Sequence, residues 1–260
     1  MCGIFGFALK QPVAMSKVFG VLARLEVHQY PTETKPVGGF GAGVAVLAND
    51  GSTVLEKVGK VAGSPARTLS EVVGVGEARV LIGHVRYPSP QFMEKTSFRE
   101  TAQPYLAECF SGLRVVSVHN GFVENCLQVR EKLGGGHVFE SDGVGFVDSE
   151  VVPHFFEHLL RECGSVDEAL GELFSGLDGN SSVGLLHVAG ERVFLHFVHK
   201  GRTRGLRVWV NDEGEVVFCS RKEPLLEVFD DMLKKYKFKE KVSIGWQEKV
   251  ETKLSVPVNL

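Results

Sequence analysis

The sequence has few of the features that mark membrane-bound, secreted or nucleic-acid-binding proteins. No apolar run approaches the roughly 20 residues that a membrane helix requires, and the chain begins MCGI, without the basic segment of a secretory signal peptide. The 29 basic and 32 acidic residues give a formal net charge of −3, so no excess of positive charge is present to neutralise a phosphate backbone. We therefore expect a cytoplasmic protein with no membrane and no nucleic acid among its partners.

Cysteine is scarce and shows no metal-binding or redox spacing. The five cysteines include no CxxC pair, and an odd number of thiols in a reducing compartment argues against a disulfide framework. The segment HFFEH has the spacing of an inverted zinc-peptidase motif at His154, Glu157 and His158. A solvated polar helix face accounts fully for this spacing, and we favour it over a zinc site. We expect neither a metal nor a cofactor.

Composition and periodicity indicate a globular protein of mixed α and β structure. Hydrophobic residues make up 43% of the 260 residues, and no linker or repeat divides them, so we expect one domain over residues 1–260. Short apolar runs predict strands at residues 2–9, 42–48, 53–58, 79–87, 115–119, 183–188, 193–198, 206–210 and 216–219. Helical spacing and caps predict helices at residues 15–25, 125–133, 148–163 and 223–237, and another beginning after residue 165. Because several strands are apolar on both faces, two stacked sheets with helices outside are predicted.

Cys2 is the first candidate for chemistry, since it directly follows the initiator methionine. If Met1 is removed, the chain begins with a thiol beside its own α-amine. An α-amine has a reference pKa of about 7.7–8.0, which suits a general base near neutral pH. One residue would then supply both nucleophile and base. The alternative is that Cys2 is a small buried apolar residue.

Four further residues suit the binding of an amino acid that carries an amide. Arg86 follows a predicted strand and can clamp a carboxylate through two hydrogen bonds. Asn120 and Gly121 offer an amide and a backbone N–H, the two donors of an oxyanion hole. Asp148 can pair with an ammonium group or, alternatively, cap a helix.

Several motifs resemble, in the same order, those of the class II glutamine amidotransferases, whose glutaminase domains use an N-terminal nucleophile. They are MCGIFG at residues 1–6, GHVRYPS at 83–89, QPY at 103–105, HNG at 119–121, SD at 141–142, DSEV at 148–151 and FCS at 218–220. The match extends over about residues 2–230, with residues 231–260 as a C-terminal extension. It is closest to the glutaminase part of amidophosphoribosyltransferase or of archaeal-type glutamate synthase.

The resemblance implies a four-layer αββα sandwich of two mostly antiparallel sheets, the N-terminal-nucleophile hydrolase fold. It implies that Cys2 attacks the side-chain amide of L-glutamine while Asn120 and Gly121 hold the oxyanion. It further implies that Arg86 and Asp148 bind the carboxylate and ammonium groups of glutamine. Three more residues fall in the substrate-binding motifs, namely Tyr87, Ser89 and His119.

Three functions remain open at this point. The residues after position 230 are too few for an ammonia-accepting module, so we expect ammonia to pass to a separate synthase subunit. A stand-alone hydrolase of γ-glutamyl amides and a non-catalytic glutamine-binding subunit are the alternatives. The segment after Ser89 is either a lid or an insertion, and homo-oligomerisation is left open.

Overall fold

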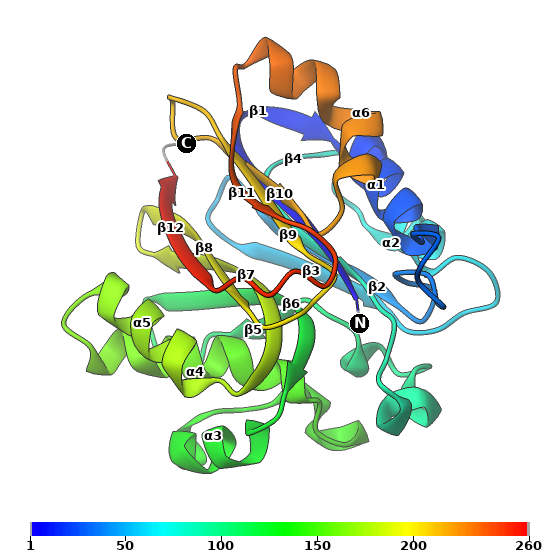
Figure 1. The fold of residues 1–260 in the computed structure, drawn as a ribbon. Coiled ribbons are helices and arrows are strands. Elements are labelled where there is room, and N and C mark those ends of the chain that lie inside the picture. The colour runs from blue at the N-terminus through cyan, green and yellow to red at the C-terminus, as the bar shows by residue number, and fades with distance from the viewer. Residues whose placement is uncertain (1, 259–260) are drawn as a thin grey trace.

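The protein consists of two antiparallel β-sheets between two layers of helices, as the computed structural model of residues 2–258 shows (Figure 1). The first sheet has seven strands in the order β11-β9-β10-β1-β4-β2-β3. Their bounds are β1 Gly3–Ala14, β2 Ala42–Leu47, β3 Thr53–Val58, β4 Glu77–Val85, β9 Leu206–Val210, β10 Val216–Cys219 and β11 Lys239–Ile244. Strand β1 therefore lies inside this sheet, between β10 and β4.

The second sheet has five strands in the order β12-β8-β7-β6-β5. Their bounds are β5 Tyr105–Ala107, β6 Leu113–Val123, β7 Gly179–Ala189, β8 Arg192–Lys200 and β12 Thr252–Val258. The last two strands of the chain thus join different sheets, because β11 pairs with β9 and β12 pairs with β8.

Successive side chains of β1 point to opposite faces of the first sheet, and this alternation explains how the layers are held together. Phe5 and Phe7 pack into the core between the first sheet and its helices. Ile4 and Ala8 point the other way, into the core between the two sheets. Successive side chains on a strand point to opposite faces, so a strand apolar on both faces needs cover on both sides.

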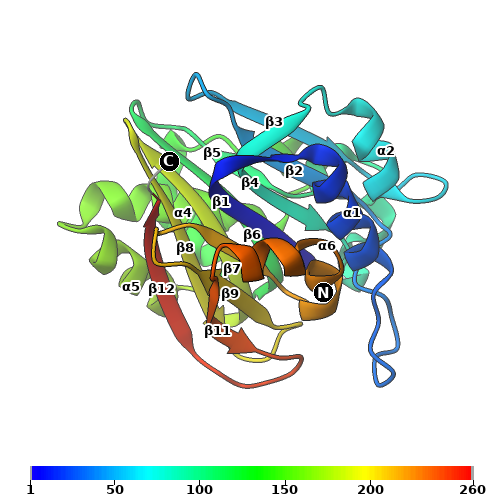
Figure 2. The same ribbon diagram turned by 90° about the horizontal axis from the view of Figure 1, so that it is seen from above.

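Each sheet carries helices on its outer face (Figures 1 and 2). The first is covered by α1 Met15–Val27, α2 Pro65–Val72 and α6 Lys222–Lys235, and the second by α3 Cys126–Leu133, α4 Val151–Glu162 and α5 Val166–Gly176. Five short 3₁₀ helices lie in the connections, at η1 Pro90–Lys95, η2 Arg99–Thr101, η3 Gly134–Gly136, η4 Glu140–Val144 and η5 Asp148–Glu150. Within residues 2–258, none of the helices has the length and apolar character needed to cross a bilayer.

The predicted αββα sandwich is confirmed, while several local predictions need correction. Helix α2 and strands β5, β11 and β12 were not predicted. The predicted helix at residues 148–163 begins with a 3₁₀ turn, and α4 proper starts at Val151. Asp148 does not cap this helix, since its side chain instead accepts a hydrogen bond from the Val123 N–H.

Candidate functional site

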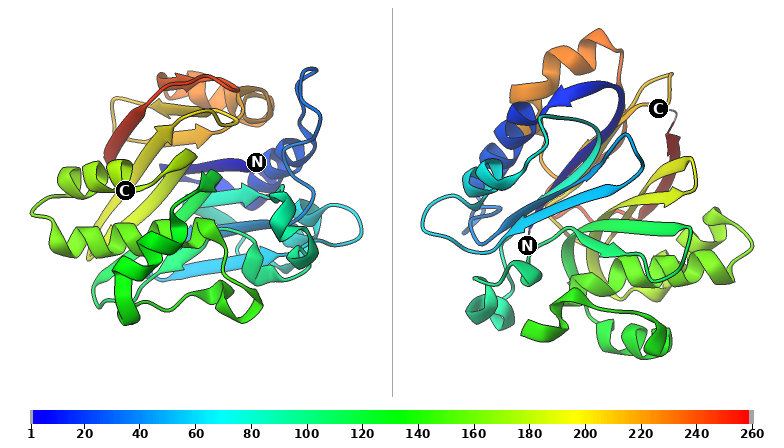
Figure 3. Two further views of the ribbon diagram at one scale, coloured as in Figure 1. Left: turned by 60° about the horizontal axis from the view of Figure 1, so that its bottom comes forward. Right: turned by 180° about the vertical axis from the view of Figure 1, so that it is seen from behind.

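The candidate site lies at the start of β1, where the register of the first sheet sets its neighbours. Gly3 pairs with Val85 at the end of β4, so Cys2 comes directly beside the residues that follow this strand. In both views of Figure 3 the N-terminal end of β1 lies between the two helical layers, at the ends of the strands. Residues from both sheets can therefore meet there.

Cys2 makes three contacts with the predicted site residues. Its backbone nitrogen donates to Oδ1 of Asn120 at 3.1 Å. Its thiol lies 3.5 Å from the carbonyl oxygen of Tyr87, and the N–H of Tyr87 points back at the sulfur at 3.4 Å. The structure thus brings residues 2, 87 and 120 together. The predicted removal of Met1 lies outside the described residues.

Asn120 has an unused hydrogen-bond donor. Its side chain is fully buried in β6, and Nδ2 has no partner among the described residues. A buried donor without a partner costs on the order of 1–3 kcal/mol. Because the backbone nitrogen of Cys2 holds Oδ1, the free Nδ2–H group is a fixed donor close to the backbone of Cys2.

Gly121 must be glycine for steric reasons. A Cβ atom at this position would lie 1.9 Å from the carbonyl oxygen of Asn180 and 2.7 Å from Nε2 of His119. Any side chain would therefore push β6 away from β7, with which it pairs here. The close packing holds the backbone beside Asn120 in place.

Arg86 is a buried cation without an acidic partner. Its side chain donates to Oγ1 of Thr101, and no carboxylate of residues 2–258 lies within ion-pair distance of it. Burial lowers the pKa of Arg86, which the nearby Cys2, Tyr105 and Asp148 groups oppose, and a guanidinium remains charged at physiological pH. A buried charge is costly until it is paired, so this position favours an anionic ligand.

Asp148 supplies the opposite charge at the same site. It is 5% exposed, and burial raises its pKa to about 6, while the hydrogen bond from Val123 and the nearby Cys2 act in opposite directions. Asp148 is bound to β6, which carries Asn120, and Arg86 directly precedes Tyr87, so both buried charges are joined to residues that contact Cys2.

Two predicted substrate-binding residues are not brought into contact with Cys2. His119 is fully buried, and its two ring nitrogens lie 2.9 Å from Oγ of Ser149 and 3.1 Å from Oγ of Ser181. It supports the strand beside Asn120, with no ring nitrogen left for a substrate. Ser89 is half-buried and precedes η1, and no side-chain hydrogen bond within residues 2–258 joins it to the site.

The segment that follows Ser89 is ordered as η1 and η2 and packs against the site. Thr101 accepts from Arg86, and its hydroxyl lies 2.8 Å from the carbonyl oxygen of Phe98 and 3.0 Å from that of Lys95. These contacts connect the segment directly to the guanidinium group. Whether it is a lid stays a prediction.

Sequence reasoning missed a buried charged cluster near the site. Glu33 forms ion pairs with Arg204 at 3.2 Å and with Arg221. Burial lowers the pKa of Arg204, and Glu33 opposes this, while Cys2 and Tyr87 also act on it electrostatically. These residues come from three distant segments, so no local motif reveals them. The only signal in the sequence is an arginine directly after the FCS motif.

The interpretation of the HFFEH segment as a solvated helix face is wrong. His154 is 1% exposed and Glu157 is fully buried. Both face the loop that carries Cys109 and the segment that carries His137. His158 instead pairs with Glu162 on the helix surface, at 3.2 Å.

Comparison with curated proteins finds relatives that use glutamine. The chain is 32% identical over 191 residues to the isomerizing glutamine–fructose-6-phosphate aminotransferase of Pseudomonas aeruginosa, covering 73% of this chain and 27% of the relative. It is 30% identical over 234 residues to the enzyme of the same name from Bacillus thuringiensis, covering 90% of this chain and 34% of the relative. The resemblance to class II glutamine amidotransferases is confirmed. No family model matches the chain.

Solved structures share the fold over nearly the whole chain. One is titled as the allosteric regulatory enzyme of purine biosynthesis, with a TM-score of 0.61 and 18% identity over 98% of this chain and 46% of that one. Another is the glutamine phosphoribosylpyrophosphate amidotransferase of B. subtilis, with a TM-score of 0.60 and 18% identity over 98% of this chain and 47% of that one. The chain spans about a third or less of the curated relatives that it matches.

Proposed function

We propose that the chain is a glutaminase, which hydrolyses the side-chain amide of glutamine through a thioester on Cys2 and supplies ammonia to a separate synthase subunit. The observation that carries this proposal is the contact of Cys2 with Asn120, whose second amide hydrogen-bond donor is buried and unused. An unused buried donor next to a sulfur nucleophile is the arrangement that an oxyanion intermediate needs.

The chemistry begins with the thiol proton of Cys2. With Met1 removed, the α-amine of Cys2 takes this proton, and the N–H of Tyr87 at 3.4 Å stabilises the sulfur anion. The sulfur attacks the amide carbon of glutamine. Nδ2 of Asn120 and the backbone N–H of Gly121 hold the resulting oxyanion, and the protonated amine gives its proton to the departing ammonia. Water then hydrolyses the thioester to release glutamate.

Charge selects the substrate in this proposal. Arg86 binds the α-carboxylate of glutamine and Asp148 binds its α-ammonium group. A simple amide would leave both buried charges unpaired, which an enzyme site rejects strongly. Tyr87 is held beside the sulfur by its backbone, and its ring packs on Phe40 at 4.9 Å, so it shapes the wall of the glutamine site.

The names of the relatives agree with this step. One pairs glutamine with fructose 6-phosphate and another pairs glutamine with phosphoribosylpyrophosphate. Glutamine is the reactant that both names share, whereas the acceptors differ. We therefore assign to this chain the reaction of glutamine that both names have in common.

The decisive experiment is a glutaminase assay on the wild type, Cys2→Ala and the control Cys163→Ser, which changes a thiol at the end of α4. We expect Cys2→Ala to lower the rate of glutamate formation by at least about 10³-fold, with Cys163→Ser at the wild-type rate. Intact mass measurement of the wild type should show that Met1 is absent. Wild-type turnover in Cys2→Ala would refute the mechanism.

The alternatives give different outcomes in the same assay. Addition of candidate synthases should raise glutaminase activity if ammonia passes to a partner. Equal activity with and without them indicates a stand-alone amide hydrolase. Glutamine binding by calorimetry without any turnover in the Met1-free protein indicates a non-catalytic binding subunit.

A further inference from the structure

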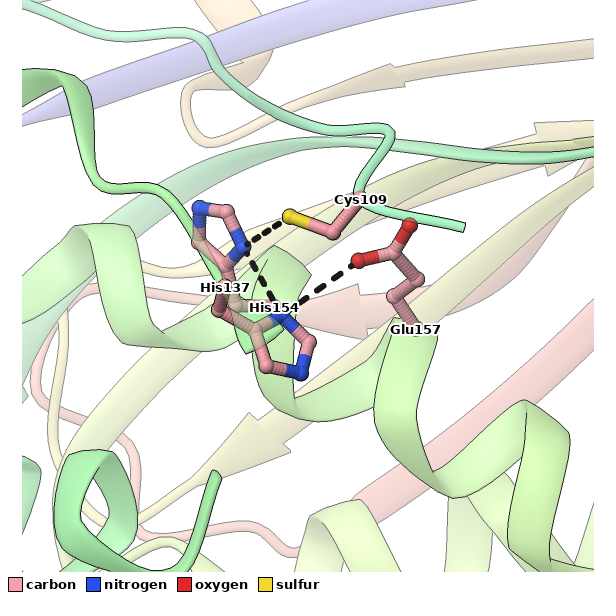
Figure 4. A group of neighbouring side chains, drawn as sticks. All are labelled: Cys109, His137, His154 and Glu157. Atoms are coloured by element: carbon pink, nitrogen blue, oxygen red, sulfur yellow. Dashed lines mark hydrogen bonds and ion pairs between the residues drawn. The ribbon is translucent and has the colours of Figure 1, made fainter. Parts of the chain in front are cut away.

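A second cluster of reactive side chains lies under α4, on the outer side of the second sheet. It contains Cys109 from the β5–β6 connection, His137 after η3, and His154 and Glu157 from α4. Figure 4 shows the four side chains pointing toward one another. The ligand atoms of all four lie within 4.8 Å of one another.

We propose that these four residues form a structural zinc site. The Nδ1 atoms of His137 and His154 are 3.3 Å apart, Sγ of Cys109 is 3.5 Å from Nδ1 of His154, and Oε2 of Glu157 is 3.5 Å from Nδ1 of His137. Zinc bonds of about 2.0–2.1 Å to nitrogen and oxygen and 2.3 Å to sulfur require ligand separations of roughly 3.3–3.6 Å in a tetrahedron. The three separations fall in this range.

Charge balance favours a divalent cation. Glu157 is fully buried, and among the described residues its only ion-pair partner is His137. A buried carboxylate without a permanent cation is costly. A Cys109 thiolate and the Glu157 carboxylate together carry two negative charges, which Zn²⁺ neutralises while both imidazoles remain neutral.

The atom of Glu157 that has no hydrogen-bond partner also indicates a zinc ligand. Oε1 of Glu157 accepts from the N–H of Phe110 at 3.2 Å, which turns Oε2 toward the cluster, where it has no hydrogen-bond partner within residues 2–258. Sulfur and imidazole ligands bind zinc in preference to magnesium or calcium. Four protein ligands close the coordination sphere, as in structural zinc sites.

The surroundings allow the ion to enter and hold the rings in place. Phe110 packs edge-on against His137 at 5.1 Å and Phe139 lies 4.4 Å from the ring of His154. Cys109 is half-buried, and His137 with Phe139 lines a surface hollow of about 410 Å³. Neither Nε2 atom has a partner among the described residues, so we expect weaker binding than in sites whose histidines are anchored on both nitrogens.

The first test is equilibrium dialysis of the full chain against Zn²⁺, followed by elemental analysis. We expect one zinc per wild-type chain, and at least about tenfold weaker binding in Cys109→Ser and His154→Gln. Two matched controls are His158→Gln, within α4, and Cys163→Ser, directly after it. Both should bind zinc as tightly as the wild type does. A wild type that binds no zinc, or loss of binding in His158→Gln equal to that in Cys109→Ser, overturns the proposal.

The second test uses Co²⁺ in place of zinc, and its spectrum needs no substitution of the four proposed ligands. The wild type and Cys2→Ala should both show the intense visible bands of tetrahedral cobalt and a sulfur-to-cobalt charge-transfer band. Loss of these bands in Cys2→Ala would assign the metal to the candidate glutamine site and overturn the proposal. Zinc should also raise the Tm of the wild type, and it should leave that of folded Cys109→Ser unchanged.

Discussion

Cys2 and Cys109 are both half-buried thiols, yet their neighbours differ in chemistry. Around Cys2 the unsatisfied groups are a hydrogen-bond donor on Asn120 and a cation on Arg86. Around Cys109 the neighbouring groups are two imidazoles and a carboxylate, each of which offers a lone pair to a metal ion. A surplus of donors suits an intermediate that develops negative charge, whereas a surplus of lone pairs suits a metal ion. The neighbours of a cysteine therefore indicate its chemistry better than its exposure does.

Among the changes that test this difference between the two cysteines, we expect the largest effect from loss of the hydrogen-bond donor of Asn120, next to Cys2. Asn120→Ala removes the Nδ2–H group that would stabilise the oxyanion, so we expect kcat for glutamine hydrolysis to fall about 10²–10³-fold. The KM for glutamine should change much less, because the donor acts on charge that appears in the transition state. Steady-state kinetics measure both constants.

Two controls keep this result specific. The exposed Asn49 lies in the turn between β2 and β3, and Asn49→Ala should leave kcat unchanged. Zinc binding by Asn120→Ala should equal that of the wild type, because the two sites use different residues. A kcat within threefold of the wild type would remove Asn120 from the proposed mechanism.

A smaller effect on glutamine hydrolysis is expected from substitution of the buried cation Arg86. Arg86→Lys keeps the positive charge but loses the planar fork that pairs with a carboxylate in two places. We expect the KM for glutamine to rise by about 10–100-fold, with a smaller change in kcat. Arg79→Lys changes an exposed arginine of β4, the strand that Arg86 follows, and should behave as the wild type. An unchanged KM in Arg86→Lys would mean that the substrate carboxylate binds elsewhere.

The smallest expected effect is the dependence of the KM for glutamine on pH. Burial raises the pKa of Asp148 to about 6, so the carboxylate loses its charge as the pH falls through this value. The KM for glutamine should therefore rise about tenfold for each pH unit below 6, while zinc-loaded and zinc-free protein should give the same profile. In Asp148→Asn the KM should be high at every pH. A wild-type KM that is flat between pH 5 and 7 contradicts the role of Asp148.

The fold could be predicted from the sequence where periodicity is strong. The interior strands β1, β4 and β7 are apolar on both faces, and their runs are visible without any structure. Strands β11 and β12 lie at sheet edges, with charged residues and, in β12, a proline, so their alternation is weak. Helix α2 was missed although Ser64 caps it ahead of Pro65 at its first turn, a signal that sequence reading can recover.

The candidate site could be predicted in part, through motifs that lie next to strand ends. Cys2 precedes β1 and Arg86 follows β4, whereas Asn120 lies inside β6, and local sequence gives the chemistry of all three. Arg204 with Glu33, and Cys109 with His137, meet only through tertiary packing. His119 stands inside a recognisable motif, but only the structure reveals that Ser149 and Ser181 occupy its ring nitrogens.

The central position of β1 has a consequence for how the protein is made. This strand is made before the other strands of both sheets, yet its ladder with β10 requires residues 216–219, and the second sheet gains its edge strand only with Thr252–Val258. Such non-local pairing makes folding slow. The nascent chain therefore carries open strand edges until residue 258 has been made, and slower translation or lower growth temperature should increase the yield of soluble protein.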